Sequence, residues 1–264
     1  MKNLLKKIVA IFIFYFYCTL SFSHELWLEP VQFNLQPNDK LQAHIKVGQN
    51  FNGEKYPYIG AETVRLNLFQ NQKAIKLKHR DGDYPAIQAV LSKKGSYVLS
   101  YQSVPELLEY DNYEKFKSFL EEQGLWDKNK FHNVEKITET YTRFAKSIII
   151  AGNEKGSDHK TGLLFEMVLK EPIRNAKINS YLPVKLLYHN KPYANSQITV
   201  FRSFEKTLDI DKIKTNSAGE ANIPIKKGGL FLLNAVHFSE NNNKKIPAKW
   251  QSLWSSLTFE IKFN

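Results

Sequence analysis

The chain has 264 residues and a formal net charge of +11. Its single cysteine, Cys18, lies in an amino-terminal segment that we expect to be removed, so the mature chain has no disulfide and depends on an ordinary hydrophobic core. Lysines and glutamates are interspersed along the chain, and together with the expected export this argues against nucleic acid as a partner.

Residues 1–23 have the features of an export signal. Lys2, Lys6 and Lys7 precede an apolar run over residues 8–20, and small residues, Ser21 and Ser23, stand at the third and first places before a cleavage site. The apolar run is shorter than a bilayer span. We therefore expect cleavage behind Ser23 and a periplasmic product that does not span the membrane. Removing 23 of the 264 residues leaves 241, and losing three lysines lowers the charge from +11 to +8.

The next region, residues 24–170, is predicted to be an amino-terminal β-rich domain. Apolar and polar residues alternate over residues 41–47 and 64–68, and turn-forming residues separate these segments. Residues 86–91 and 96–101 are predicted to form a hairpin around the turn at residues 93–95.

A helical insert is predicted within this domain, at about residues 106–148. Apolar residues first recur there at helical spacing, and a second helix is expected over residues 134–148. Arg143 and Lys146 are three residues apart on that second helix. They are suited to holding an anion, but a solvated basic edge is the commoner arrangement. The face of the second helix would consist of Ile137, Tyr141, Phe144 and Ile148.

Residues 171–264 are predicted to form a separate carboxy-terminal β-sandwich module of the immunoglobulin or prealbumin sort. Strands are expected at residues 182–188, 197–201, 221–225, 229–238 and 256–263, and the last of these alternates as a half-buried sheet edge does. Trp250 and Trp254 are expected in the core, with a ligand cleft as the alternative. The predicted fold class is mainly β: two β-sandwich-like domains with a helical insert in the first.

His24 is the first candidate site residue, because cleavage behind Ser23 makes it the mature amino terminus. Its free amine and one ring nitrogen then chelate a single metal ion. Both groups must lose a proton first, and their ordinary pKa values are about 7.7–8.0 for the amine and about 6.5 for the ring. Nitrogen donors of this kind favour Cu(II) and Ni(II) over the earlier divalent metals.

A second ligand is needed, and His237, near the end of a predicted strand, is the best candidate. A buried, hydrogen-bonded structural histidine is an equally good interpretation of His237. His44 is expected to be exposed on a polar strand face, His79 is ambiguous, and three others fall in predicted loops: His132, His159 beside Asp158, and His189. The sequence contains no HExxH, P-loop, GxSxG or EF-hand pattern.

Several segments of the chain resemble one family of exported bacterial proteins. The family is a domain-of-unknown-function family labelled as the periplasmic component of cobalt/nickel transport, or nickel uptake family. The resemblance implies a metal-related periplasmic role, with His24 and His237 at positions that match the family's recurring histidines. Asn216 stands where the family often has Asp. The matching segments are residues 24–30, 47–53, 141–146, 189–192, 215–220, 234–237 and 250–259.

From these observations we expect a periplasmic protein that captures or buffers nickel, cobalt or copper and delivers it to a membrane transporter. His24 would supply an amine and an imidazole, and His237 a second imidazole. One alternative is a copper-dependent oxidative enzyme that uses a histidine brace. The other is a metal-free β-sandwich that binds carbohydrate or protein.

Overall fold

The structure, a computed structural model, describes residues 24–131 and 137–263, so the predicted export signal and His132 lie outside the described residues. The expected fold class, mainly β with a sandwich-like arrangement, is confirmed. Among the described residues there is one α-helix, α1 (Tyr113–Glu122), and there are two short 3-10 helices, η1 (Gly60–Glu62) and η2 (Ile173–Asn175).

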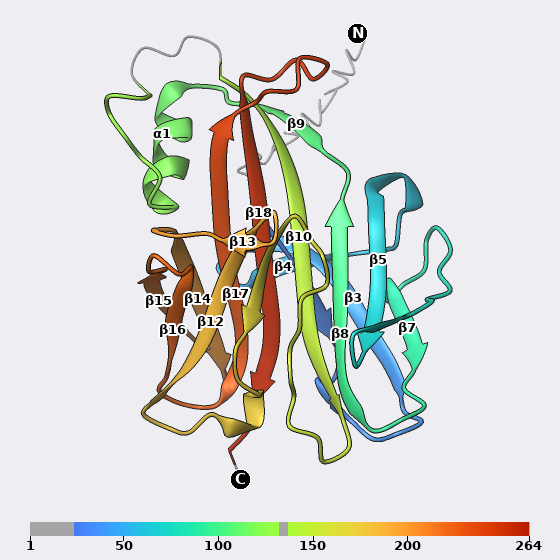
Figure 1. Cartoon of the computed structure of the whole chain (residues 1–264). Coiled ribbons are helices and arrows are strands. Elements are labelled where there is room, and N and C mark those ends of the chain that lie inside the picture. The colour runs from blue at the N-terminus through green and yellow to red at the C-terminus, as the bar shows by residue number, and fades with distance from the viewer. Residues whose placement is uncertain (1–23, 132–136, 264) are drawn as a thin grey trace, which may run out of the picture.

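A ten-stranded sheet forms the centre of the molecule, with eight strands in the order β15-β14-β17-β18-β10-β8-β5-β6 (Figure 1). Two short strands, β2 and β9, also pair with β10. The pairing of β10 with β18 is parallel, with Glu139 opposite Trp250 and Ser147 opposite Thr258. The ten strands are β2 (Asn34–Leu35), β5 (Thr63–Gln70), β6 (Lys73–Ile75), β8 (Gly95–Ser103), β9 (Glu106–Glu109), β10 (Thr138–Ala151), β14 (Gln197–Phe204), β15 (Thr207–Lys214), β17 (Gly229–Glu240) and β18 (Trp250–Ile261).

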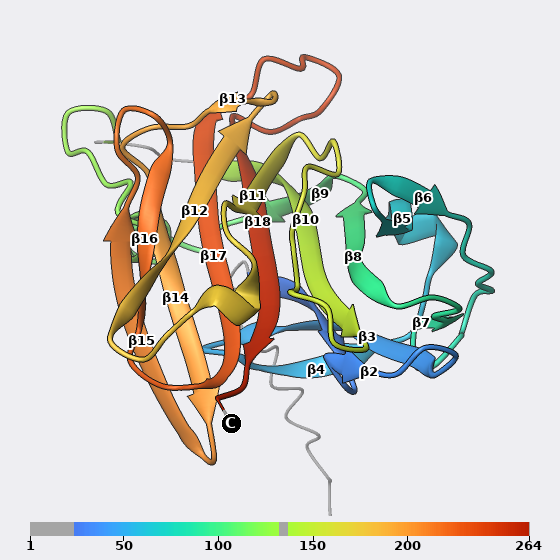
Figure 2. The same cartoon turned by 60° about the horizontal axis from the view of Figure 1, so that its bottom comes forward.

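Two smaller sheets cover opposite faces of the central sheet (Figure 2). Neighbouring residues of a strand point to opposite faces, and Ala145 of β10 joins one core while Phe144 joins the other. We call these faces the β1 side and the β12 side. The β1 side carries β1 (Glu25–Pro30), β3 (Lys40–Gln49), β4 (Asn52–Tyr56) and β7 (Ile87–Val90), and the β12 side carries β11 (Phe165–Leu169), β12 (Ser180–Tyr188), β13 (Lys191–Pro192) and β16 (Glu220–Ile225).

The second predicted helix, residues 134–148, is wrong over residues 138–148, which belong to β10, while residues 134–136 lie outside the described residues. The strand is buried on both faces from Glu139 to its end, so it shows no alternation of apolar and polar residues. Its apolar residues therefore also fit helical spacing. Within the described part of the predicted insert, the only helix is α1. Asn112 caps it by accepting a hydrogen bond from the Lys115 N–H at 3.0 Å.

The helix packs on the β1 side through a cluster of aromatic rings. Phe119 stacks on Trp254 with the ring centroids 5.6 Å apart, and Phe116 stacks on Trp250 at 6.3 Å. The prediction that both tryptophans lie in the core is confirmed. Stacked rings of this size contribute packing energy beyond their buried area.

All the strands predicted for the carboxy-terminal module are present. Two details of the prediction need correction, the last of these strands and the hairpin in the amino-terminal region. The last strand begins already at Trp250 and lies between β17 and β10, so it is not a sheet edge. The predicted hairpin over residues 86–101 is also wrong, because β7 pairs with β3 while β8 pairs with β5 and β10. The central sheet runs through both predicted domains, 24–170 and 171–264, because β10 and β18 pair.

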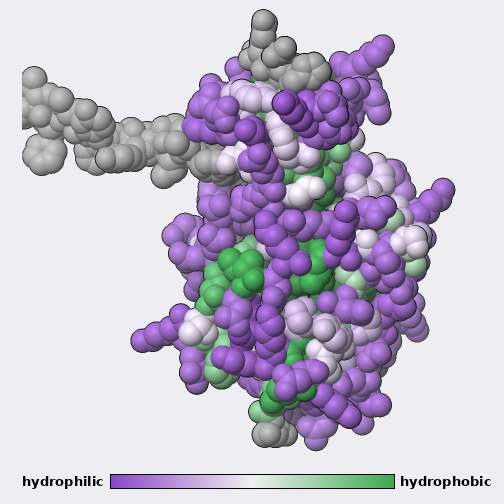
Figure 3. Space-filling view, turned by 90° about the vertical axis from the view of Figure 1, so that its left-hand side faces the viewer, coloured by the Kyte–Doolittle hydropathy of each residue, from purple (hydrophilic) through white to green (hydrophobic). Residues whose placement is uncertain are grey.

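The outer strand of the central sheet, β15, leaves one edge unpaired in the described residues. Leu208 and Ile210 are exposed on it, and Lys212 and Lys214 follow. On this side of the molecule the apolar areas are separate from one another and surrounded by hydrophilic residues (Figure 3). Charged residues on an edge strand disfavour pairing with another chain.

Candidate functional site

A cavity of about 370 Å³ opens on the β1 side, beside the point where β1 begins. His24, the residue directly before β1, is part of its wall, so the predicted mature amino terminus lies at this cavity. The other residues of the wall come from β1, β3, β4, η1, β5, β8, β9 and β10 and from the loop between β4 and η1. They include Leu26, Ile45, Val47, Tyr56, Glu62, Tyr101, Ser103, Glu106, Tyr141 and Arg143.

Arg143 organises the polar part of this wall. Its Nε donates a hydrogen bond to the carbonyl oxygen of His24 at 3.2 Å, and its Nη1 donates to Glu106 Oε1 at 3.2 Å. The guanidinium carbon lies 4.5 Å from the centre of the Tyr141 ring, and the Tyr141 hydroxyl donates to Glu106 Oε2 at 2.7 Å. One arginine therefore fixes both His24 and the carboxylate of Glu106.

The prediction of a solvated basic edge at Arg143 and Lys146 is wrong. Both side chains are buried, and because they are three residues apart on a strand they point to opposite faces of the sheet. Arg143 faces the β1 side and the cavity. Lys146 faces the β12 side, where it contacts Asp158 and Glu166.

The electrostatics of the cavity favour a neutral imidazole at His24. The pKa of His24 is lowered, first by partial burial and then by the positive charge of Arg143. A neutral ring keeps a lone pair that a metal can use. Burial, with a contribution from Glu106, raises the pKa of Tyr141 to about 12, so this hydroxyl remains a hydrogen-bond donor at neutral pH.

Glu25 follows His24 but points away from the cavity, because successive residues of β1 alternate and Leu26 lines the cavity wall. The side chain is buried, and its Oε2 has no hydrogen-bond partner among the described residues. Burial raises the pKa of Glu25 to about 7, although Arg143 opposes this shift. This carboxyl group is therefore partly protonated near neutral pH.

His237, the second predicted ligand, lies on the β12 side. Its Nδ1 is 2.7 Å from the Tyr193 hydroxyl, and its ring stacks on Tyr188 with the centroids 4.5 Å apart. Burial lowers the pKa of His237, and Lys130 and His189 lower it further. Because the central sheet separates His237 from His24, the structure does not bring the two predicted ligands to one site.

The remaining histidines add no further ligand at the cavity among the described residues. His44 is 7% exposed and its ring lies 5.3 Å from that of Tyr84, so the expectation that it is exposed is wrong. His159 lies on the β12 side, near Phe69. Within residues 24–131 and 137–263, no three His, Cys, Asp or Glu residues gather into a group that could hold a metal ion.

The sequence did not identify Glu106 and Tyr141 as site residues. Both fall in the segment predicted to be a helical insert, which placed Tyr141 on the buried face of a helix. Tyr141-Thr142-Arg143 is part of a segment that resembles the known family, and this was the signal that pointed to Tyr141. Arg143 was also noted, with Lys146, as a residue suited to holding an anion. No feature of the sequence pointed to Glu106.

Comparison with protein families gives a match over residues 21–239 to the family described as Domain of unknown function (DUF4198). The chain belongs to this family. No curated protein matches the chain.

Among solved structures, the chain is similar to one described as the crystal structure of a tetra-tandem repeat in the extending region of a large adhesion protein. The sequence identity is 10% and the TM-score is 0.23, with 91% of this chain and 50% of that chain covered. The chain thus spans half of that structure, and a likeness this weak carries no argument about fold or function. No helix among the described residues is long and apolar enough to cross a membrane.

Proposed function

We propose that the mature protein is a periplasmic binder of a divalent transition metal, nickel, cobalt or copper, which it captures or buffers and delivers to a membrane transporter. The metal is cargo in this proposal. The supporting observation is the position of His24, whose carbonyl oxygen is held by Arg143 at the wall of the 370 Å³ cavity.

The donors that this proposal uses come mainly from one residue. Once the chain begins at His24, its amine and imidazole form a chelate that needs no second protein ligand to assemble. The lowered pKa of the imidazole favours the neutral ring that a metal requires. The same cavity wall carries two carboxylates, Glu62 and Glu106. Water or a small ligand carried with the metal would fill the other positions.

His237 has no place in this site, because it lies across the central sheet and its Nδ1 is engaged by Tyr193. This makes His237 a matched control for His24. The two residues are of the same type and are both partly buried. Only His24 lies at the cavity.

The decisive experiment is calorimetric titration of the protein beginning at His24 with nickel, cobalt and copper salts. A version with one additional Ala before His24 blocks the amine and is expected to lose most of the affinity. His24→Ala is expected to lose it as well. His237→Ala is expected to bind with an unchanged Kd.

Equal binding by the Ala-extended protein would contradict the role of the amine. The cleavage site is tested separately, by mass spectrometry of the amino-terminal peptide of protein recovered from the cell envelope. A mature chain that begins at any residue other than His24 would remove the basis of the proposal.

A further inference from the structure

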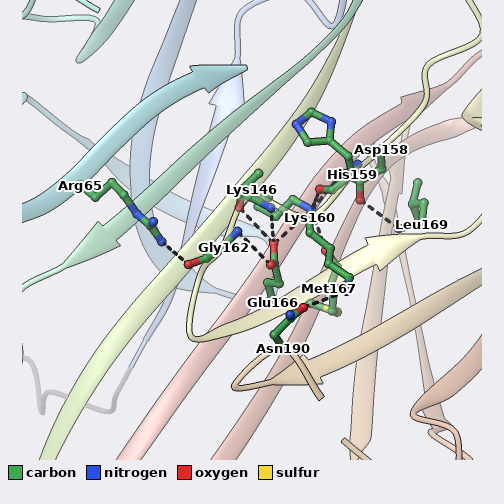
Figure 4. A network of polar contacts seen from close by, with 11 residues as sticks. Arg65, Lys146, Asp158, His159, Lys160, Gly162, Glu166, Met167, Leu169 and Asn190 are labelled. Atoms are coloured by element: carbon green, nitrogen blue, oxygen red, sulfur yellow. Dashed lines mark hydrogen bonds and ion pairs between the residues drawn. The ribbon is translucent and has the colours of Figure 1, made fainter. Parts of the chain in front are cut away.

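A second polar cluster lies on the β12 side of the sheet, and the proposed metal site does not use it. Its centre is Lys146 of β10, which reaches from the middle strands of the sheet toward β11 and the segment that precedes it (Figure 4). Asp158 lies in that segment and Glu166 lies in β11. The side chains of Lys146, Asp158 and Glu166 are only 1%, 0% and 2% exposed, respectively.

Lys146 Nζ lies close to both carboxyl groups. It is 2.9 Å from Asp158 Oδ1 and 3.7 Å from Glu166 Oε2. It also donates hydrogen bonds to the carbonyl oxygens of His159 and Met167, both at 2.9 Å. The carboxyl carbon of Asp158 is one bond beyond the oxygen that Nζ contacts.

Backbone groups hold both carboxylates in place. Asp158 Oδ2 accepts from the Leu169 N–H at 2.9 Å, and Oδ1 accepts from the His159 N–H at 2.7 Å. Glu166 Oε2 accepts from the Thr161 N–H and hydroxyl at 2.9 and 3.0 Å, and Oε1 accepts from the Gly162 N–H at 3.1 Å. The nitrogen and the carboxyl group therefore face one another with little freedom to separate.

We propose that Lys146 and Asp158 join covalently in the folded protein, forming an amide bond between Lys146 Nζ and Asp158 Cγ, with Glu166 as the proton carrier. A primary amine held against a carboxyl group in a buried site has the proximity that such a condensation needs. Burial also favours the reaction, because it replaces two charges that are costly to keep away from water with one neutral amide.

The step balances without any oxidant, reductant or further reactant. Glu166 takes a proton from the Lys146 ammonium, and the neutral amine attacks Asp158 Cγ to form the new C–N bond. A second amine proton and the proton held by Glu166 leave with one Asp158 oxygen as water, while the C–O bond breaks. Glu166 ends as the carboxylate with which it began, so it acts as a general base and then as a general acid.

The surroundings suit the product as well as the starting groups. The amide N–H can keep one of the two carbonyl acceptors, at His159 or Met167, and the remaining Asp158 oxygen can keep a backbone donor. Glu166 keeps its three donors from Thr161 and Gly162. The bond would close a loop from residue 146 to residue 158 and tie β10 to the segment that leads into β11.

Mass spectrometry of a tryptic digest of the full chain tests the proposal. The expected product joins residues 144–155, uncleaved behind Lys146, to residues 156–160, and its mass is the sum of these two peptides minus one water. Fragmentation should locate the link at Lys146 and Asp158. Complete cleavage behind Lys146, with residues 147–155 and residues 156–160 recovered as separate peptides of full mass, would overturn the proposal.

Three variants assign the roles. Lys146→Arg keeps the charge and is expected to show no link, and a mass deficit that persisted in this variant would also overturn the proposal. Asp158→Asn is expected to form the same link with loss of ammonia instead of water. Glu166→Gln is expected to fold, as checked by circular dichroism, and to remain mostly unlinked, whereas full linkage in it would exclude Glu166 as the proton carrier.

Discussion

Replacing Glu139 by Gln should make the protein more stable at pH 8 and change its stability little at pH 5. Glu139 is fully buried on the β1 side, where Oε2 accepts a hydrogen bond from the Tyr110 hydroxyl at 2.6 Å. Its Oε1 pairs with the Ser252 hydroxyl, which also accepts from Trp254 Nε1 at 2.9 Å. Burial raises the pKa of Glu139 from 4.5 to about 7, although its hydrogen bonds and Arg143 oppose the shift.

The sign of the effect follows from where the proton is bound. Between pH 4.5 and about 7 the folded protein holds this proton and the unfolded chain has released it, so this group's contribution to stability falls as the pH rises through that range. At pH 8 this pKa shift lowers the free energy of unfolding by roughly 3 kcal/mol relative to its value at acid pH. Gln has no charge to bury, and it offers the same acceptor to Tyr110 and a donor to Ser252.

The assay is urea unfolding of both proteins at pH 5 and pH 8. We expect the difference in unfolding free energy between Glu139→Gln and the unchanged protein to shift by roughly 2–3 kcal/mol in favour of the variant at the higher pH. Glu25, whose pKa burial also raises to about 7, is present in both proteins, so its contribution cancels in the difference. A difference that stays constant between the two pH values would refute the reasoning.

Three further predictions concern the amino-terminal site and the packing around it. Nickel affinity measured by calorimetry should fall about tenfold when the pH is lowered from 7.5 to 6.5, because the His24 amine must lose its proton to bind the metal. A Kd that does not change with pH would contradict this. Gly53→Ala should lower stability by about 1–3 kcal/mol in a urea titration, because the added Cβ would lie 2.6 Å from the Trp27 ring, whereas Glu54→Ala beside it should change little. Trp254→Ala should cost about 3–5 kcal/mol, because it removes the ring that stacks on Phe119, and a change below 1 kcal/mol would show that α1 does not depend on this contact.

The carboxy-terminal strands could be predicted because they are bounded by turn residues and show alternation. Leu257, Phe259 and Ile261 point into the β12-side core, as their spacing indicates. The failure at β10 has a physical cause. A strand covered on both faces does not alternate between buried and exposed positions, and β10 buries polar residues such as Arg143 and Lys146 as well as apolar ones. Period two therefore disappears, and Tyr141, Phe144 and Ile148 fit a helix equally well.

The site could be predicted only in part, for a related reason. That His24 lies next to a structured segment is evident from the sequence, but the face on which a residue lies depends on the pairing of distant strands. To recognise that His24 and His237 lie on opposite faces of the sheet, one must know that β17 and β10 flank β18. The spacing of residues along the chain does not reveal this. The helix predicted over residues 134–148 also put Arg143 and Lys146 on one face, because residues three apart share a helix face but not a strand face.

The parallel pairing of β10 with β18 has a consequence for how the chain is completed. During synthesis, β10 is finished at Ala151, 99 residues before its neighbour β18 begins at Trp250. Until then, the flank of β10 that β18 covers, from Glu139 to Ser147, has no permanent partner. A product truncated ahead of residue 250 would therefore lose the middle of the sheet rather than its margin, and even a short deletion there should prevent both halves from reaching the native state.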